Sequence, residues 1–171
     1  MPDVVAHLLA PDGAIPNHPR WPLLIYPGAV AIAGPDPALA FEEMFKRNRW
    51  PAAWRNGVYP FHHFHSTGHE ALGIYEGEVT VQFGGDAGVS VTARPGDVIV
   101  LPAGTGHKRL SASPDFEVVG AYPEGRDWDL IRADDSDRRI HDEAVTRIAK
   151  VPKPAYDPVT GKDGPLARLW A

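Results

Sequence analysis

The sequence predicts an all-β core, built as a jelly-roll-like barrel, with two accessory α-helices. Several short segments alternate apolar and polar residues with the period of two that a half-buried strand shows. Tight-turn residues separate these segments, and the 171-residue chain contains 17 Gly and 18 Pro. Two other segments repeat apolar residues at helical spacing. A chain of this length can bury the core of one domain, which we expect to span residues 1–171.

The N-terminal part, residues 1–56, is expected to form an arm, two strands and a helix. Four prolines in residues 1–20 favour an irregular arm. Strands are predicted at residues 21–26 and 29–33, on either side of a Pro-Gly turn.

A helix is predicted to follow and to end near Asn48. Asp36 is expected to cap it, with Pro37 at its first position. Its apolar stripe, which we interpret as core packing, consists of Leu39, Ala40, Phe41, Met44 and Phe45. We interpret Trp50 and Trp54 as anchors of a lid against the barrel.

Residues 57–122 form the predicted barrel core. Apolar residues alternate with polar ones at 79–83 and 89–93, around a Gly-rich hairpin turn at 84–88. A further strand is predicted at 116–122. Short strands at this spacing indicate a barrel or jelly roll.

The C-terminal part, residues 123–171, is expected to form one helix and a docked tail. Ile140, Ala144 and Ile148 recur at helical spacing, and the helix should stop before Pro152. Since a near-terminal tryptophan is seldom exposed, Trp170 predicts that the tail packs on the barrel.

Composition excludes several classes of function. The chain has no cysteine, so neither a disulfide framework nor a thiolate metal site is available. The formal net charge of −5 argues against a nucleic-acid partner, which needs a basic face. No signal peptide is evident, and no apolar run approaches the ~20 residues of a membrane span. We expect a cytoplasmic protein without a membrane partner.

The segment 57–77 carries four of the eight histidines. His63 and His65 share one face of a strand because side chains alternate with a period of two. A turn at residues 66–68 leads into a returning strand that carries Glu70. Two imidazoles and a carboxylate that converge in this way suit a divalent metal ion.

Downstream, a buried strand at residues 98–101 runs into a turn at 102–106, which delivers His107 to the start of the next strand. Together the two segments resemble the two-part signature of the cupin superfamily. Its first motif matches at Gly57, His63, His65, Glu70 and Gly77, and its second at Gly96, Pro102, Gly104 and His107. The final Asn of the second motif is Ser111 here, a position that is not a metal ligand in the family.

Nearly the whole chain resembles the YjlB-like branch of the cupins, in residues 14–17, 54–57, 62–67, 102–107 and 163–170. The resemblance implies a cupin-type double-stranded β-helix. It also favours a homodimer, because N-terminal strands of cupins often take part in subunit exchange.

We expect His63, His65, Glu70 and His107 to hold one divalent metal ion: Fe, Mn, Ni, Co, Cu or Zn. His69 is the alternative to Glu70. Leu72 and Ile74 share the face of Glu70, and this bulkier aliphatic face should be the barrel interior. The large Tyr75 lies on the face of His69, which weakens that argument if a helix covers this side.

Other residues are candidates for the surroundings of the metal. Arg109 shares the strand face of His107, and there it either binds an anionic substrate or extends from the barrel mouth into solvent. Tyr59, Phe61 and Tyr122 line the pocket or pack in the core. His62, of opposite strand phase, either contacts a metal ligand from behind or lies at the surface, and His69 is another candidate for contact with a metal ligand.

Two functions are consistent with these residues. The first is a metal-dependent enzyme acting on a small, anionic or carbonyl molecule, for which the resemblance suggests a dioxygenase, isomerase, decarboxylase or lyase. The second is a non-catalytic, metal-dependent module that binds or senses a small molecule. The sequence identifies no catalytic residue beyond the metal ligands.

Overall fold

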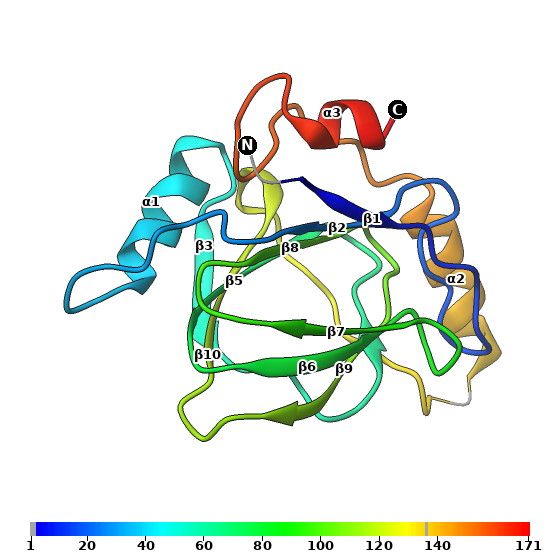
Figure 1. Ribbon diagram of the computed structural model, residues 1–171. Coiled ribbons are helices and arrows are strands. Elements are labelled where there is room, and N and C mark those ends of the chain that lie inside the picture. Colours follow the sequence, from blue (N-terminus) through cyan, green and yellow to red (C-terminus); the bar gives the residue numbers. More distant parts are fainter. Residues whose placement is uncertain (1–2, 136) are drawn as a thin grey trace.

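Two antiparallel sheets face each other in the computed structural model, which describes residues 3–135 and 137–171 (Figure 1). The first sheet contains, in spatial order, β1 (Val5–His7), β2 (Leu23–Tyr26), β8 (Val98–Leu101), β5 (Glu70–Glu76), β10 (Glu117–Ala121) and β3 (Ala52–Asn56). The second contains β11 (Ile131–Arg132), β4 (His63–Phe64), β9 (His107–Ala112), β6 (Val79–Phe83) and β7 (Val89–Ala93). This is a jelly-roll sandwich.

Apolar side chains alternate across the strands as a half-buried sheet requires. Leu72 and Ile74 of β5 point between the sheets, where they meet residues such as Val81 of β6. Ala71 and Tyr75 point to the opposite face of the first sheet. The first sheet is therefore covered on both faces, and β5 is buried along nearly its whole length.

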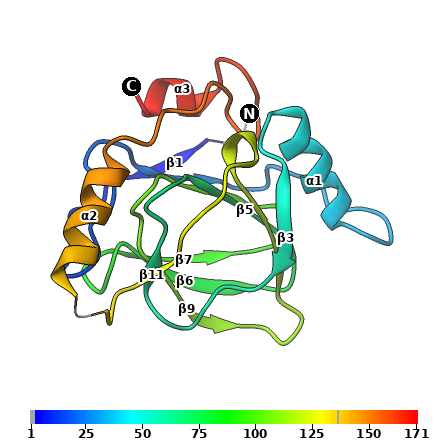
Figure 2. The same cartoon turned by 180° about the vertical axis from the view of Figure 1, so that it is seen from behind.

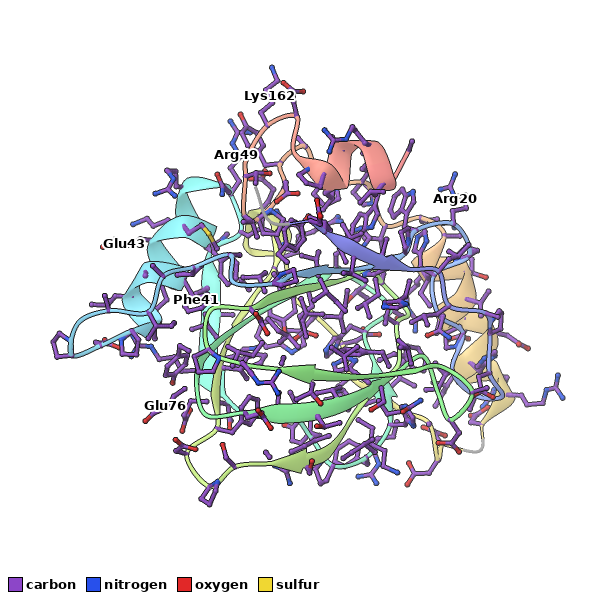
Figure 3. The ribbon with its side chains drawn as sticks, in the orientation of Figure 1. Arg20, Phe41, Glu43, Arg49, Glu76 and Lys162 are labelled. Carbon is purple, nitrogen blue, oxygen red and sulfur yellow. The ribbon has the colours of Figure 1, made fainter. Side chains whose placement is uncertain are left out.

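The outer face of the first sheet is covered by α1 (Ala38–Arg47) and by the C-terminal tail with α3 (Pro165–Leu169) (Figures 1 and 2). Phe41 of α1 points toward the sheet, whereas Glu43 points outward (Figure 3). A side chain on Gly73 of β5 would collide with the Phe41 ring, so the glycine lets the helix approach closely. A separate helix, α2 (Arg138–Ile148), packs through Ala144 and Ile148 against Phe64.

The docked tail is confirmed. Trp170 is fully buried, its ring stacks on Trp21 with centroids 5.3 Å apart, and its indole N–H donates to the carbonyl of Pro22 at 2.8 Å. Trp50 is also fully buried and donates to the carbonyl of Tyr156 at 2.8 Å, so it anchors the tail. Trp54 lies on β3, which makes the prediction of a lid anchor wrong for this residue.

Several local predictions are corrected by the structure. The arm is not wholly irregular, because β1 pairs with β2. Residues 29–33 form no strand: both edges of β2 are occupied, by β1 and β8, so the segment after the Pro-Gly turn cannot fold back onto β2. The strand β3 and the five-residue helix α3 were not predicted.

The start of α1 also differs from the prediction. Pro37 is the N-cap residue, and no side chain caps this helix. The carboxylate of Asp36 is instead held by the guanidinium of Arg55, at 3.0 and 3.1 Å. The buried stripe of the helix includes Ala38 rather than Leu39, which is 49% exposed.

Among the residues described by the structure, no helix has the length and apolar character that a membrane crossing needs.

Candidate metal centre

Four of the predicted site residues meet where the two sheets face each other. His63 on β4 is the direct cross-strand partner of His107, the first residue of β9. His65 follows β4, and Glu70 begins β5 in the other sheet. All four are buried, with exposures of 3 to 6%.

The turn before His107 depends on glycine. Gly104 has a φ of 89°, a left-handed conformation that most residues avoid. A Cβ at this position would also lie 2.8 Å from Ile148 Cδ1 and 2.9 Å from the carbonyl oxygen of Asn17. The backbone at residues 102–106 can therefore pass beneath α2 and deliver His107 to the site.

The three histidines form a cluster that suits a divalent metal ion. One ring nitrogen from each of His63, His65 and His107 lies within 4.8 Å of the others. Each Nδ1 faces a backbone carbonyl, of Phe61, Asp129 and Thr105 respectively. Since a carbonyl only accepts, Nδ1 carries the proton in each ring, and Nε2 keeps a lone pair for a metal.

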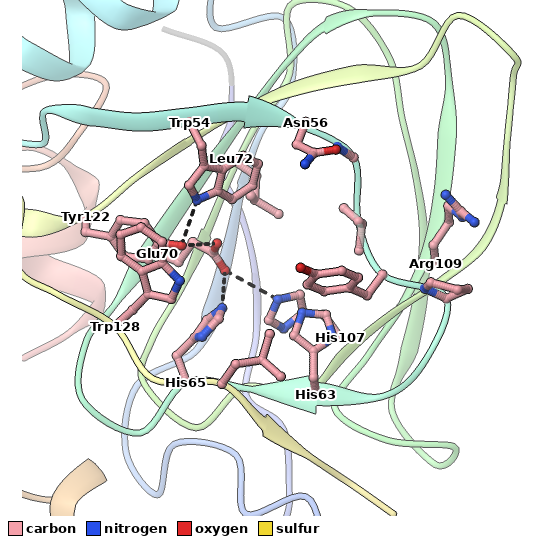
Figure 4. Close-up of a pocket in the computed structure, with 15 residues that line it drawn as sticks. Trp54, Asn56, His63, His65, Glu70, Leu72, His107, Arg109, Tyr122 and Trp128 are labelled. Atoms are coloured by element: carbon pink, nitrogen blue, oxygen red, sulfur yellow. Dashed lines mark hydrogen bonds and ion pairs between the residues drawn. The ribbon is translucent and has the colours of Figure 1, made fainter.

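Glu70 supplies a carboxylate to the same place. Its Oε2 lies 3.3 Å from Nε2 of His65 and 3.4 Å from Nε2 of His107 (Figure 4). Oε2 is buried and has no hydrogen-bond partner among the described residues, whereas Oε1 accepts a hydrogen bond from the Tyr122 hydroxyl at 2.9 Å. An unpaired buried carboxylate oxygen beside imidazole lone pairs is unfavourable without a cation. The residues therefore fit a divalent metal ion.

The protonation of three of these groups follows from their surroundings. Burial, and next the neighbouring His107, lowers the pKa of His63 to about 3, so this ring is neutral. Burial opposes charge on both His65 and Glu70. The attraction between them nevertheless raises the pKa of His65 and holds the pKa of Glu70 well below its usual value. Without a metal, a second proton, at Nε2 of His65, would partly offset the Glu70 charge. A divalent cation bound at the Nε2 lone pairs would take the place of that proton.

His69 and His62 lie outside this cluster. The buried His69 accepts a hydrogen bond at Nδ1 from the amide of Ala103 at 2.9 Å and donates from Nε2 to the carbonyl of Pro152 at 3.1 Å. Both of its nitrogens are therefore already used on the outer face of the sheet. The His62 side chain is 10% exposed, and its Nδ1 lies 3.9 Å from the carboxylate of Asp86.

A cavity of about 280 Å³ opens directly beside the cluster (Figure 4). Much of its wall is aromatic or aliphatic, and includes Trp54, Tyr59, Leu72, Tyr122, Trp128 and Leu130. The ring of Trp128 stacks on that of Tyr122, with centroids 4.2 Å apart. Trp54 donates from its indole N–H to the Tyr122 hydroxyl at 3.1 Å. The cavity therefore offers a small molecule apolar surface next to the metal ligands.

The predicted pocket residues take different places. Tyr59, Arg109 and Tyr122 line the cavity. Arg109 extends away from the histidines (Figure 4). Phe61 is not among the described residues of the wall; its ring stacks on Tyr59 at 4.9 Å and lies under the guanidinium of Arg132 at 3.9 Å.

Sequence reasoning did not assign several wall residues to the site. Trp54 and Asn56 reach the cavity from β3, and Trp128 and Leu130 reach it from the segment before β11. Between the latter two lies Asp129, whose carbonyl accepts from His65. The alternation of polar and apolar residues over 127–130 is the one sequence signal that indicates a common face for Trp128 and Leu130.

A known protein that resembles nearly the whole chain shows its family. A scan against models of protein families finds no match. A protein of Bacillus subtilis (strain 168), named Uncharacterized protein YjlB, is 44% identical over 159 residues, which cover 93% of this chain and 92% of that protein. The chain belongs to the YjlB family. With the motif residues gathered between two antiparallel sheets, this YjlB-family protein is a cupin.

Solved structures resemble this YjlB-family chain only distantly. A vicilin from Solanum melongena is 18% identical, with 57% of this chain covered, 33% of that chain covered and a TM-score of 0.38. A DUF861 family protein from Thermotoga maritima is 25% identical, with coverages of 53% and 96% and a TM-score of 0.32. An oxalate decarboxylase from Lactobacillus farciminis, solved as a formate complex, is 15% identical, with coverages of 88% and 42% and a TM-score of 0.37.

Proposed function

We propose that this protein binds one divalent metal ion through His63, His65, Glu70 and His107, and acts through it on a small, anionic molecule held in the adjoining cavity. The metal would supply Lewis-acid or redox chemistry at coordination positions that the protein leaves open. The reaction class that we favour is that of a dioxygenase, isomerase or lyase. The metal is one of Fe, Mn, Ni, Co, Cu and Zn, because mixed nitrogen and oxygen ligation suits each of them.

One observation carries this proposal. Three buried imidazoles direct Nε2 lone pairs toward a point beside a buried carboxylate oxygen that has no hydrogen-bond partner among the described residues. Burial of such a group is costly unless a cation compensates it. An ordinary core would give each of these groups a hydrogen-bond partner, as the backbone of Ala103 and Pro152 does for His69.

The cavity supports a small-molecule ligand. Its aromatic wall can bury a ring or short chain, and Arg109 gives one end a permanent positive charge. Tyr122 donates to Glu70 and accepts from Trp54, so its hydroxyl holds the carboxylate in one orientation. An apolar cavity next to open metal positions favours an enzyme over the alternative, a non-catalytic binding or sensing module.

The metal is tested first. We expect elemental analysis of the purified protein to find about one divalent ion per chain. His63→Gln should lose it, and His7→Gln, a change on the distant strand β1, should keep it. Absence of any bound divalent metal, even after incubation with each of the six ions, would contradict the proposal.

Turnover separates the two functions. We expect oxygen uptake or product formation by the metal-loaded protein with at least one member of a panel of small carboxylic acids and phenols. Arg109→Ala should weaken binding of the anionic members and keep the metal. Saturable binding without turnover would favour the binding module. If Arg109→Ala also loses metal, the residue supports the fold and the assignment of an anion site is wrong.

Three further points stay predictions: a homodimer, the absence of a nucleic-acid or membrane partner, and a cytoplasmic location. Light scattering measures the first, and fractionation of cells the last.

A further inference from the structure

The turn that follows His65 is held by one residue from a distant part of the chain. The carboxylate of Asp129 accepts hydrogen bonds from the amide of Ser66 at 2.6 Å, from the amide and hydroxyl of Thr67 at 3.3 Å each, and from the Ser66 hydroxyl. The amide of Asp129 in turn donates to the Thr67 hydroxyl at 3.1 Å. Hydrogen bonds donated in both directions therefore join Asp129 to residues 66–67.

The same residue orients a metal ligand directly. The backbone carbonyl of Asp129 accepts from Nδ1 of His65, which fixes both the ring and the tautomer that leaves Nε2 free. Arg147 of α2 reinforces the arrangement: its Nε donates to the Ser66 hydroxyl at 2.9 Å, and its Nη2 lies 3.8 Å from the Asp129 carboxylate. Burial opposes ionisation of Asp129, but the donors from Ser66 and Thr67 keep its pKa below the usual value.

The neighbours of Asp129 form part of the cavity wall. Trp128 and Leu130 both line the cavity, although they are 41% and 42% exposed. Trp128 stacks on Tyr122, the residue that donates to Glu70. One residue further, β11 pairs with β4, so that Arg132 lies opposite His63. The segment 128–132 thus touches two ligands and one side of the cavity.

We propose that Asp129 is a positioning residue that couples metal binding to the cavity wall. The inference rests on the proposed function, because it assumes that His65 binds the metal. Asp129 then fixes the His65 ring and the positions of Trp128 and Leu130 together, so that neither changes without the other. Coupling of this kind is reciprocal, so a metal on His65 stabilises the wall, and a wall held in place favours the metal.

The physical reason is that the Asp129 carboxylate ties the segment to the turn after His65, whereas the pairing of β11 with β4 and the stacking of Trp128 on Tyr122 hold it elsewhere. Trp128 and Leu130 lie partly in solvent, and β11 has only two residues. The carboxylate of Asp129 gathers four donors in one place, and charge-assisted hydrogen bonds are about twice as strong as neutral ones. Without them we expect the carbonyl of Asp129 to shift and the His65 ring to lose its orientation.

Asp129→Ala tests the coupling, with Asp127→Ala as the matched control. Asp127 has the same charge, lies two residues away and is exposed. Co(II) titration is the first measurement. We expect the affinity of Asp129→Ala for Co(II) to fall about 10–100-fold, the range that loss of an outer-shell partner causes, and that of Asp127→Ala to stay within about twofold. The visible spectrum of the Co(II) complex should change for Asp129→Ala alone.

Hydrogen exchange is the second measurement. Co(II) should slow amide exchange over residues 126–132 in the wild-type protein and in Asp127→Ala, and should leave it unchanged in Asp129→Ala. If Asp129→Ala does not fold, Asp129→Asn carries the test, because its amide oxygen keeps one acceptor and should give a smaller loss in the same direction.

The outcomes separate the two proposals. Wild-type protein that binds neither Co(II) nor any of the other five ions overturns both. Tight Co(II) binding by the wild type, with the same affinity, spectrum and exchange pattern in Asp129→Ala, overturns the coupling and leaves the metal site intact. A lower melting temperature of Asp129→Ala with an unchanged Co(II) complex also overturns it, because the residue would then support only the fold.

Discussion

Glu70 and His69 are adjacent residues that serve opposite faces of β5. Glu70 meets the histidine cluster between the sheets, and His69 packs among Trp21 and Trp170 on the outer face. The prediction from the sequence placed Leu72 and Ile74 inside, and the structure confirms this placement. The reservation about Tyr75 was also sound, because α1 does cover that face.

This arrangement predicts different results for the two substitutions. Glu70→Gln removes the charge that compensates the metal, and we expect it to lower metal affinity by more than about tenfold, since even outer-shell changes reach that range. His69→Gln should keep metal affinity and lower the melting temperature. Isothermal titration with Co(II) and thermal unfolding measure these effects.

Glu76→Gln is the control, because Glu76 ends the same strand in an exposed position (Figure 3). Loss of metal from His69→Gln, with metal retained by Glu70→Gln, would reverse the assignment of the fourth ligand.

His18 gives the protein a pH dependence of its own. Burial, and next the charge of Arg20, lowers the pKa of His18 to about 4. Its Nδ1 accepts from the amides of Arg20 and Trp21, at 3.2 and 2.9 Å, and its ring stacks on Trp21 with centroids 4.4 Å apart. His69 lies nearby, with ring centroids 6.3 Å apart. The folded state therefore holds His18 neutral.

Stability should fall as the pH drops from about 6.5, the ordinary pKa of histidine, toward 4. In this window His18 of the unfolded chain binds a proton that the folded one does not, so His18 alone decreases the free energy of unfolding by at most about 1.4 kcal/mol per pH unit. His18→Asn keeps an acceptor and cannot take the proton, which should flatten the profile. Urea unfolding at pH 7 and pH 5 measures it; an unchanged slope in His18→Asn, compared with His7→Asn, would contradict this role.

At the scale of single residues, the sequence predicted those side chains that a fixed local spacing brings together. His63 and His65 lie on one short segment, and Glu70 follows across one turn. Asp129 could not be predicted in this way. Its role depends on the chain returning, some sixty residues later, to the turn at Ser66 and Thr67.

Gly73 shows how closely one element packs on another. The Phe41 ring of α1 occupies the space that a Cβ on Gly73 would need. We expect Gly73→Ala to lower the free energy of unfolding by about 1–3 kcal/mol, as overpacking does. Chemical denaturation measures it.

Gly57→Ala is a suitable control, since the nearest atom to its Cβ would be a ring carbon of Phe116 at 3.8 Å, an ordinary contact. If Gly73→Ala proves as stable as Gly57→Ala, then α1 can shift, and close approach does not determine its position.

Secondary structure was predictable where local pattern and tertiary position agree. The strands β6 and β7 alternate apolar and polar residues, and their hairpin turn lies where it was predicted. The strand β3 was not predicted because Ala52, Ala53 and Asn56 carry no such pattern. This strand forms because it pairs with β10. Residues 29–33 show the converse, an apparent strand that cannot pair with β2 because β1 and β8 occupy both of its edges.

At the scale of the whole molecule, the proposed ligands come from both sheets. Glu70 belongs to the six-stranded sheet, and His63 and His107 belong to the five-stranded one. A metal bound to all of them would connect the two layers. Since an unfolded chain does not assemble such a site, a metal would bind the folded state selectively.

Removing the metal should therefore lower the melting temperature. At a free metal concentration of about 100 times Kd, the stabilisation is about 2.7 kcal/mol, and at 2–4 °C per kcal/mol for a domain of this size the shift is about 5–11 °C. Thermal unfolding with metal and with chelator measures it. The shift should vanish in Glu70→Gln, and equal melting temperatures of the wild-type protein in both conditions would contradict the prediction.

The position of the ligands also has a mechanical consequence. A bond from one sheet to the other resists sliding of the layers, which apolar side chains between them resist only weakly because their contacts are not directional. Pulled along the strands in a force spectrometer, the loaded protein would break at a higher force than the stripped one. The ion would then act as a cross-link between the two sheets, and the length of its coordination bonds would set the spacing between them at this point.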